Sequence, residues 1–190
     1  MGSEVPDLFP GKSGVHRIGD HVVHVVVSGI GPQRARRATE RMCTGFHDFY
    51  PDWIMALGFC GGTRDDLDIG HLIVADRVAY RNREIALDGV PFAGAVRASQ
   101  GMTYHIGQVQ MVDWPALSRN RVTAATLAVD MESFAIVDTA QHHHTPVMIV
   151  KAVSDIVPRR TSVKNLLNLA PFGAQEAKSQ LDAFAKRYFS

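Results

Sequence analysis

Two acidic motifs in the second half of the chain have residue types and a placement that suit catalysis. Asp130-Met131-Glu132 stands just before a helical pattern, and Ser154-Asp155 follows the apolar run 147–153. A run of this length and composition is typical of a strand buried on both faces of an α/β sheet. Ligands collect at the carboxyl ends of such strands, and burial raises the pKa of a carboxyl group toward neutrality. We therefore expect Asp155 to act as a general acid, oriented by a hydrogen bond from Ser154.

The elements that must hold these motifs follow from the apolar periodicity. The spacing of Phe134, Val137 and Ala140 predicts a helix. It should end near residues 142–144, because the residue before Pro146 is disfavoured in the α region. Other segments are predicted, in chain order, as a strand at 21–27, a helix at 33–43, a strand at 53–57, an apolar run at 72–75 and a helical tail within 162–189. Strands that alternate with helices predict a fold of the α/β class.

Length and composition predict one globular domain over residues 1–190. The chain has 190 residues, of which 46% are hydrophobic, and this suffices for one sizeable core. A formal net charge of +1 gives no overall attraction to nucleic acid or to an anionic membrane, and no apolar run approaches the ~20 residues that span a bilayer. Cys43 and Cys60 lack CxxC spacing and imply neither a disulfide framework nor a zinc site. We expect a cytoplasmic protein without nucleic-acid or membrane partners.

Two clusters of basic residues invite binding hypotheses that the pattern does not favour. Arg34, Arg37 and Arg41 share one face of the predicted helix at 33–43, which is more typical of a solvated surface than of a phosphate or nucleic-acid site. The three histidines at 142–144 suggest a metal site. Three consecutive side chains cannot all face one ion, however, and histidines suit the negative end of a helix dipole. We expect no metal.

Several motifs together resemble the signature of the purine nucleoside phosphorylase and nucleosidase superfamily. The Met131-Glu132 and Ser154-Asp155 steps carry the resemblance first, and it extends over roughly residues 24–160. Three more segments support it, namely the turn Ser28-Gly29-Ile30-Gly31, the glycine-rich loop Gly58–Gly62 after a strand with the apolar stretch that reaches Asp76, and a segment Tyr104–Pro115 similar to a strand of the family. Among its branches, the chain is most similar to the 5′-methylthioadenosine/S-adenosylhomocysteine nucleosidases. The glycines of the first turn could equally serve only to let the chain enter the following helix.

The resemblance implies a fold and a reaction. The fold would be a three-layer sandwich with a mixed central sheet. The reaction would be cleavage of a purine N-ribosidic bond, in which Asp155 protonates N7 of the base. Glu132 would bind the 2′- and 3′-hydroxyls, although alone it also fits an acid favoured at a helix N-terminus. Met131 would pack against the ribose.

The resemblance also implies further binding residues and separates the hydrolases from the phosphorylases. Phe59 and Gly61 of the glycine-rich segment would approach the substrate, and Trp114 would border the base, unless it is only an aromatic anchor in a loop. Phosphorylases need phosphate-binding side chains at the positions of Ala56 and Phe59, and neither residue here can supply one. We therefore expect hydrolysis by water, without any cofactor. A futalosine-type hydrolase (suggested by Val157–Arg160), a phosphorylase, and a catalytically idle nucleoside-binding or storage protein remain as alternatives.

The two ends of the substrate pocket raise separate expectations. The segment Pro115–Thr126 is short for the family, which leaves the 5′ side of the pocket open and favours a homodimer whose neighbour closes it. Met1–Val5 resembles the family loop in which a glutamate activates the attacking water, a role that falls to Glu4. Residues 1–14 would then be a loop remnant, and the usual first strand would be lacking or replaced by another chain. The alternative is that Glu4 is an ordinary exposed residue.

Overall fold

A mixed β-sheet forms the centre of the computed structural model, which describes residues 13–45, 50–113, 120, 122–158 and 173–190. The strand order in this six-stranded sheet is β5-β4-β6-β7-β3-β8. The strands are β3 (Ile54–Gly62), β4 (Leu72–Tyr80), β5 (Arg83–Ala86), β6 (Tyr104–Met111), β7 (Thr126–Asp130) and β8 (Val147–Ile156). Strand β8, at the edge of this order, also pairs antiparallel with β4, so the sheet is curved enough for these two strands to meet.

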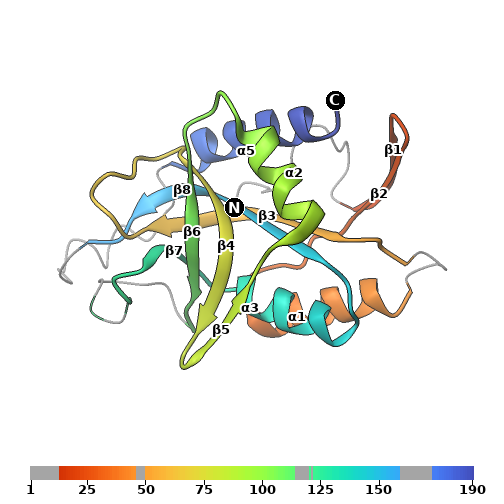
Figure 1. The fold of residues 1–190 in the computed structure, drawn as a ribbon, viewed down its shortest axis with the longest axis horizontal. Coiled ribbons are helices and arrows are strands. Elements are labelled where there is room, and N and C mark those ends of the chain that lie inside the picture. The colour runs from red at the N-terminus through yellow and green to blue at the C-terminus, as the bar shows by residue number, and fades with distance from the viewer. Residues whose placement is uncertain (1–12, 46–49, 114–119, 121, 159–172) are drawn as a thin grey trace.

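Two layers of helices cover the two faces of this sheet (Figure 1). Helices α1 (Pro32–Cys43) and α3 (Ser133–His142) lie on one face, and α2 (Gly89–Ser99) and α5 (Ala174–Tyr188) lie on the other. Successive strand residues therefore enter different cores: Ile149 packs with Phe134 of α3, whereas Met148 packs with Phe184 of α5. This explains why β8 is apolar at nearly every position. The predicted three-layer α/β sandwich with a mixed sheet is confirmed.

The N-terminal part of the described chain forms a separate hairpin. Strand β1 (Gly14–Ile18) pairs antiparallel with β2 (His21–Val25), and an extended linker leads from there to α1. The predicted strand at 21–27 thus ends two residues early. The expectations for the first strand and for Glu4 concern residues 1–12, which lie outside the described residues.

The glycine-rich segment Gly58–Gly62 corrects one expectation from the sequence, because it belongs to strand β3 and is not a loop. It pairs in parallel with β8, with a register shift between Cys60 and Gly61. A Cβ atom on Gly62 would lie 2.9 Å from Cδ1 of Ile156, so the strands approach more closely here than a side chain would permit. Glycines that predict a loop by local preference therefore mark a bulge and a close approach of strands within a sheet.

Four elements were not predicted from the sequence. Strand β1 precedes the first predicted strand, β5 and α2 fall in the segment 81–100, whose composition is mixed, and β7 is a short buried strand of five residues. The predicted tail helix is present as α5, and its Leu181 and Phe184 are fully buried against the sheet as expected. The apolar residues of the tail between 162 and 172 lie outside the described residues.

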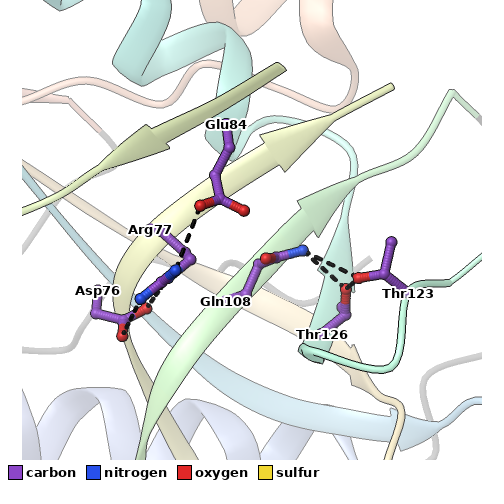
Figure 2. Close-up of polar contacts among 6 residues, drawn as sticks. All are labelled: Asp76, Arg77, Glu84, Gln108, Thr123 and Thr126. Atoms are coloured by element: carbon purple, nitrogen blue, oxygen red, sulfur yellow. Dashed lines mark hydrogen bonds and ion pairs between the residues drawn. The ribbon is translucent and has the colours of Figure 1, made fainter. Parts of the chain in front are cut away.

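Polar side chains fix the start of β7 against β6 (Figure 2). The amide nitrogen of Gln108 donates to the hydroxyl oxygens of Thr126, at 3.0 Å, and Thr123, at 3.3 Å. On the neighbouring hairpin, Arg77 bridges Asp76 and Glu84. Asp76, the last residue of one family motif, is thus held in an ion pair on β4. The hydrogen bonds of Gln108 hold β7 in place, and Asp130-Met131-Glu132 lies at the carboxyl end of this strand.

Candidate functional site

The carboxyl end of β8 presents Ser154 and Asp155. Ser154 is buried, and its hydroxyl lies 2.9 Å from Oδ1 of Asp155 and 3.4 Å from the carbonyl oxygen of Cys60. Asp155 remains accessible to solvent, yet protein atoms surround enough of its carboxyl group that desolvation raises its pKa above the usual value. The hydrogen bond from Ser154 acts in the opposite direction and lowers the pKa, but burial is the larger effect. An accessible carboxyl group with a raised pKa has the properties that a general acid needs.

Gly61 joins the ends of two strands at this point. It pairs with Val129 of β7 on one side and with Asp155 of β8 on the other. A Cβ atom on Gly61 would lie 2.9 Å from Cγ2 of Val157 and 3.3 Å from Oδ2 of Asp155. Because Gly61 has no side chain, the Asp155 carboxyl group can lie this close to β3. Although β3 and β7 run antiparallel, they pair only at Gly61 and Gly62, so Val129 near the end of β7 lies level with Asp155 near the end of β8.

The turn after β7 holds Met131 and Glu132, both half-buried, in front of helix α3. Glu132 is the N-cap residue of this helix, and its Oε1 atom accepts a hydrogen bond of 2.6 Å from the backbone N–H of Gly31. Gly31 has a φ of +102°, a conformation that favours glycine. The Ser28–Gly31 turn is therefore in contact with the proposed sugar-binding carboxylate.

A buried ion pair lies beneath this turn, and the sequence analysis missed it. Nζ of Lys151 on β8 lies 2.8 Å from Oδ2 of Asp130, and both side chains are almost completely buried. Asp130 also accepts bonds from the backbone N–H of Ser133 (3.2 Å) and from its hydroxyl group. The signal in the sequence was a lone charged residue, Lys151, within a strand that is otherwise apolar up to Ser154.

The other predicted substrate-binding residues have different surroundings. Phe59 is half-buried and packs against the core under α2 and α5, and Ala56 is buried in the opposite core. Cys60 is fully buried, and burial raises the pKa of its thiol, which supports a packing role. Trp114 and Glu4 lie outside the described residues.

The basic residues considered as alternatives lie elsewhere on the molecule. Arg34, Arg37 and Arg41 are exposed on α1, where they line a groove of about 380 Å³ together with the linker Val25–Ser28. Neither Asp155 nor Glu132 is among the described residues that line this groove, so it is not the site discussed above. A ring nitrogen of His142 lies 2.5 Å from the carbonyl oxygen of Asp138.

Other histidines contact residues other than Asp155. Nε2 of His143 lies 3.1 Å from Glu40, whereas His142 contacts Asp138, so these two neighbouring histidines have different partners. His105 stacks on His71. Within the part of the chain that the structure describes, no three residues of the types His, Cys, Asp or Glu form a group able to hold a metal ion.

Comparison with known proteins assigns the chain to a family. The model of the phosphorylase superfamily matches residues 10–114, more than half of the chain. The protein therefore belongs to the phosphorylase superfamily. No helix among the described residues is long and apolar enough to cross a membrane.

The chain is also similar in sequence to individual nucleosidases. A 5′-methylthioadenosine/S-adenosylhomocysteine nucleosidase of Lysinibacillus sphaericus is 26% identical over 167 residues, which cover 74% of this chain and 71% of the relative. The corresponding protein of Chromohalobacter salexigens is 24% identical over 172 residues (75% and 72%).

Solved structures show the same fold. The nucleosidase of Neisseria meningitidis superposes with a TM-score of 0.74 at 21% identity and covers 90% of this chain and 84% of its own. The futalosine hydrolase of Helicobacter pylori superposes with a TM-score of 0.75 at 18% identity and covers 98% and 94%.

Proposed function

We propose that this protein is a purine nucleosidase that hydrolyses the N-ribosidic bond of a 5′-modified adenosine, of the methylthioadenosine or adenosylhomocysteine type. The observation that carries the proposal is the Ser154–Asp155 pair, an accessible carboxyl group whose pKa is raised by burial at the end of β8. The bond breaks with difficulty because the purine is a poor leaving group as a free anion. Asp155 donates a proton to N7, and the base then leaves as a neutral molecule.

The sugar is bound at the turn after β7. As the bond breaks, the ribose develops the positive charge of an oxocarbenium ion, which a nearby carboxylate stabilises. Glu132 supplies this carboxylate and accepts hydrogen bonds from the 2′- and 3′-hydroxyls, while Met131 packs against the ring. The bond from the N–H of Gly31 supports the role, because it orients the carboxylate. Phe59, Gly61 and Trp114 border the rest of the substrate in this proposal.

Water is the attacking group in the proposed reaction. Phosphorolysis would need side chains that bind phosphate at positions 56 and 59. Ala56 is buried in one core and Phe59 packs against the other, so neither offers such a group. Glu4 is proposed to activate the water. No metal or organic cofactor takes part in the proposed steps.

The test is product analysis with methylthioadenosine in the presence and absence of phosphate. The proposal predicts free adenine and methylthioribose, at a rate that does not depend on phosphate. A ribose 1-phosphate product would instead identify a phosphorylase. Binding of the nucleoside without any release of base would identify the idle, nucleoside-binding alternative.

A second candidate is a futalosine-type hydrolase. It is favoured by the breadth of the structural match to the Helicobacter pylori enzyme, which extends over 98% of this chain and 94% of that one. The Ser154-Asp155 step favours an aminopurine instead, because a carboxyl group can both donate to N7 and accept from an exocyclic amino group. Parallel assays with methylthioadenosine and futalosine separate the two candidates by their kcat/KM values.

Assembly and location complete the proposal. A homodimer is proposed because the short segment 115–126 leaves the 5′ side of the pocket to be closed by a neighbour. Light scattering at micromolar concentration checks this, and a monomer would contradict it. A cytoplasmic location is proposed because Cys43 and Cys60 are both free thiols, as is usual for proteins in a reducing compartment.

A further inference from the structure

Lys151 is a charged residue placed where the fold calls for an apolar one. Its side chain is about 5% exposed, and the residues around it on β8 pack into the two cores. A buried ion pair contributes little net stability, because desolvation offsets the attraction between the charges, and an apolar pair often serves as well. A specific geometric role is the other reason for such a pair to be present. The contacts of Asp130 indicate that this role concerns the backbone before and at the start of α3.

Asp130 anchors the first turn of α3. Its carboxylate accepts from the backbone N–H of Ser133 at 3.2 Å, and its Oδ1 atom lies 3.4 Å from the backbone nitrogen of Glu132. These N–H groups stand at the N-terminus of a helix, where no intrahelical partner exists. Lys151 holds the same carboxylate from below, at 2.8 Å. The backbone of Glu132 is thereby connected through Asp130 to strand β8.

Strand β8 also carries the proposed acid, four residues after Lys151. A β-strand is rigid over so short a distance, and both of its faces are packed here. A continuous series of contacts thus runs from Asp155 along β8 to Lys151, and from there through Asp130 to Glu132. From the other side, the N–H of Gly31 holds the Glu132 carboxylate at 2.6 Å.

We propose that Asp130 and Lys151 are positioning residues that hold Glu132 at a fixed place relative to the strand of Asp155. The inference rests on the proposed function, in which Glu132 binds the sugar hydroxyls. Neither residue touches the reacting atoms in this account. Lys151 and Asp130 carry opposite charges and form an ion pair, so together they add no net charge beneath the turn that holds Glu132.

A double-mutant cycle tests the inference. Adenine release from methylthioadenosine is measured for the wild type, Asp130→Asn, Glu132→Gln and the double variant, with KM and kcat determined separately. Asp130→Asn should reduce kcat/KM by about tenfold or more, the scale of one hydrogen bond to a charged group. In the Glu132→Gln background, the same change should have less than about a twofold effect, because Asp130 acts through Glu132.

Two further variants separate positioning from folding. Asp138→Asn is the matched control: Asp138 is a largely buried aspartate on the same helix, and its Oδ1 atom lies 2.6 Å from Nη2 of Arg83. It should leave kcat/KM within about twofold of the wild type. Lys151→Arg keeps the charge and should retain activity better than Lys151→Met, with melting temperatures recorded for all variants.

Each outcome decides the matter. Additive effects of Asp130→Asn and Glu132→Gln, or equal losses in Asp130→Asn and Asp138→Asn, would overturn the inference while leaving the proposed function intact. A wild type that releases no base would overturn the proposed function, and the inference with it.

Discussion

Two aspartates at the ends of strands on either side of β3 have opposite environments. Asp130, at the end of β7, has a side chain only about 1% exposed and is paired with Lys151 and with the hydroxyl and N–H of Ser133. Asp155, near the end of β8, is accessible, and the structure shows one hydroxyl group, that of Ser154, on its carboxyl group. The first carboxyl group forms an ion pair with a buried lysine, whereas desolvation raises the pKa of the second. The same residue type is structural in one place and suited to acid catalysis in the other.

Replacing the partner of the first aspartate gives the largest expected effect. Lys151→Met leaves Asp130 buried without its cation and should lower the free energy of unfolding by about 3–5 kcal/mol. Chemical denaturation measures this loss. If the variant were as stable as the wild type, Asp130 would not depend on its ion pair, and the contrast between the two aspartates would be lost.

Removal of the proposed acid should affect turnover instead of stability. Asp155→Asn should reduce turnover by about a hundredfold or more, the usual scale of general acid catalysis. Because the pKa of Asp155 is raised in the folded state, ionisation of this group destabilises the fold once the pH exceeds that pKa. At neutral pH the neutral asparagine should therefore be at least as stable as the wild type. A clear fall in melting temperature would show that Asp155 is structural as well.

A substitution at Gly61 tests whether the carboxyl group of Asp155 needs the space beside β3 that a glycine provides. Gly61→Ala places a methyl group 2.9 Å from Val157 and 3.3 Å from the carboxyl group of Asp155. We expect a loss of about 1–3 kcal/mol in stability from overpacking, together with reduced turnover. Gly62→Ala meets Ile156 at the same 2.9 Å and serves as the control, since it should lower stability with a smaller effect on turnover.

The smallest expected effect comes from the partner of the acid. The hydrogen bond from Ser154 lowers the pKa of Asp155, so Ser154→Ala should raise that pKa further. Activity that needs protonated Asp155 would then persist to higher pH, with a loss of turnover of at most about tenfold. The pH dependence of kcat/KM measures the shift. Movement of the profile to lower pH would contradict the assigned role of the hydroxyl group.

The places of the candidate site residues in the fold were easier to predict from the sequence than the contacts around them. Ser154 and Asp155 were predicted near a strand end because a long apolar run ends at them, and burial on both faces of a strand is visible as hydrophobicity. Glu132 was predicted just before a helical pattern, and it precedes α3. The bond between Gly31 and Glu132 joins residues 101 positions apart, and no local pattern encodes such a contact.

The fold shows the same limit. Strand β7 has only five residues, and its register depends on the hydrogen bond between Gln108 of β6 and its own Thr126. The glycines at 58–62 predict a turn by their local preference, yet the pairing of β3 with β7 and β8 places them in a strand. Long elements with a continuous periodicity were therefore predictable, whereas short elements fixed by tertiary contacts were not.

The central claim is that Asp155 delivers the proton, and the pH dependence of adenine release from methylthioadenosine tests it most directly. Because the donor must be protonated, kcat/KM of the wild type should fall as the pH rises through the pKa of Asp155, which lies above that of an ordinary carboxyl group. Asp155→Asn should lose this dependence and remain slow at every pH. An Asp155→Asn variant that folds, turns over like the wild type and keeps the same pH profile would contradict the account.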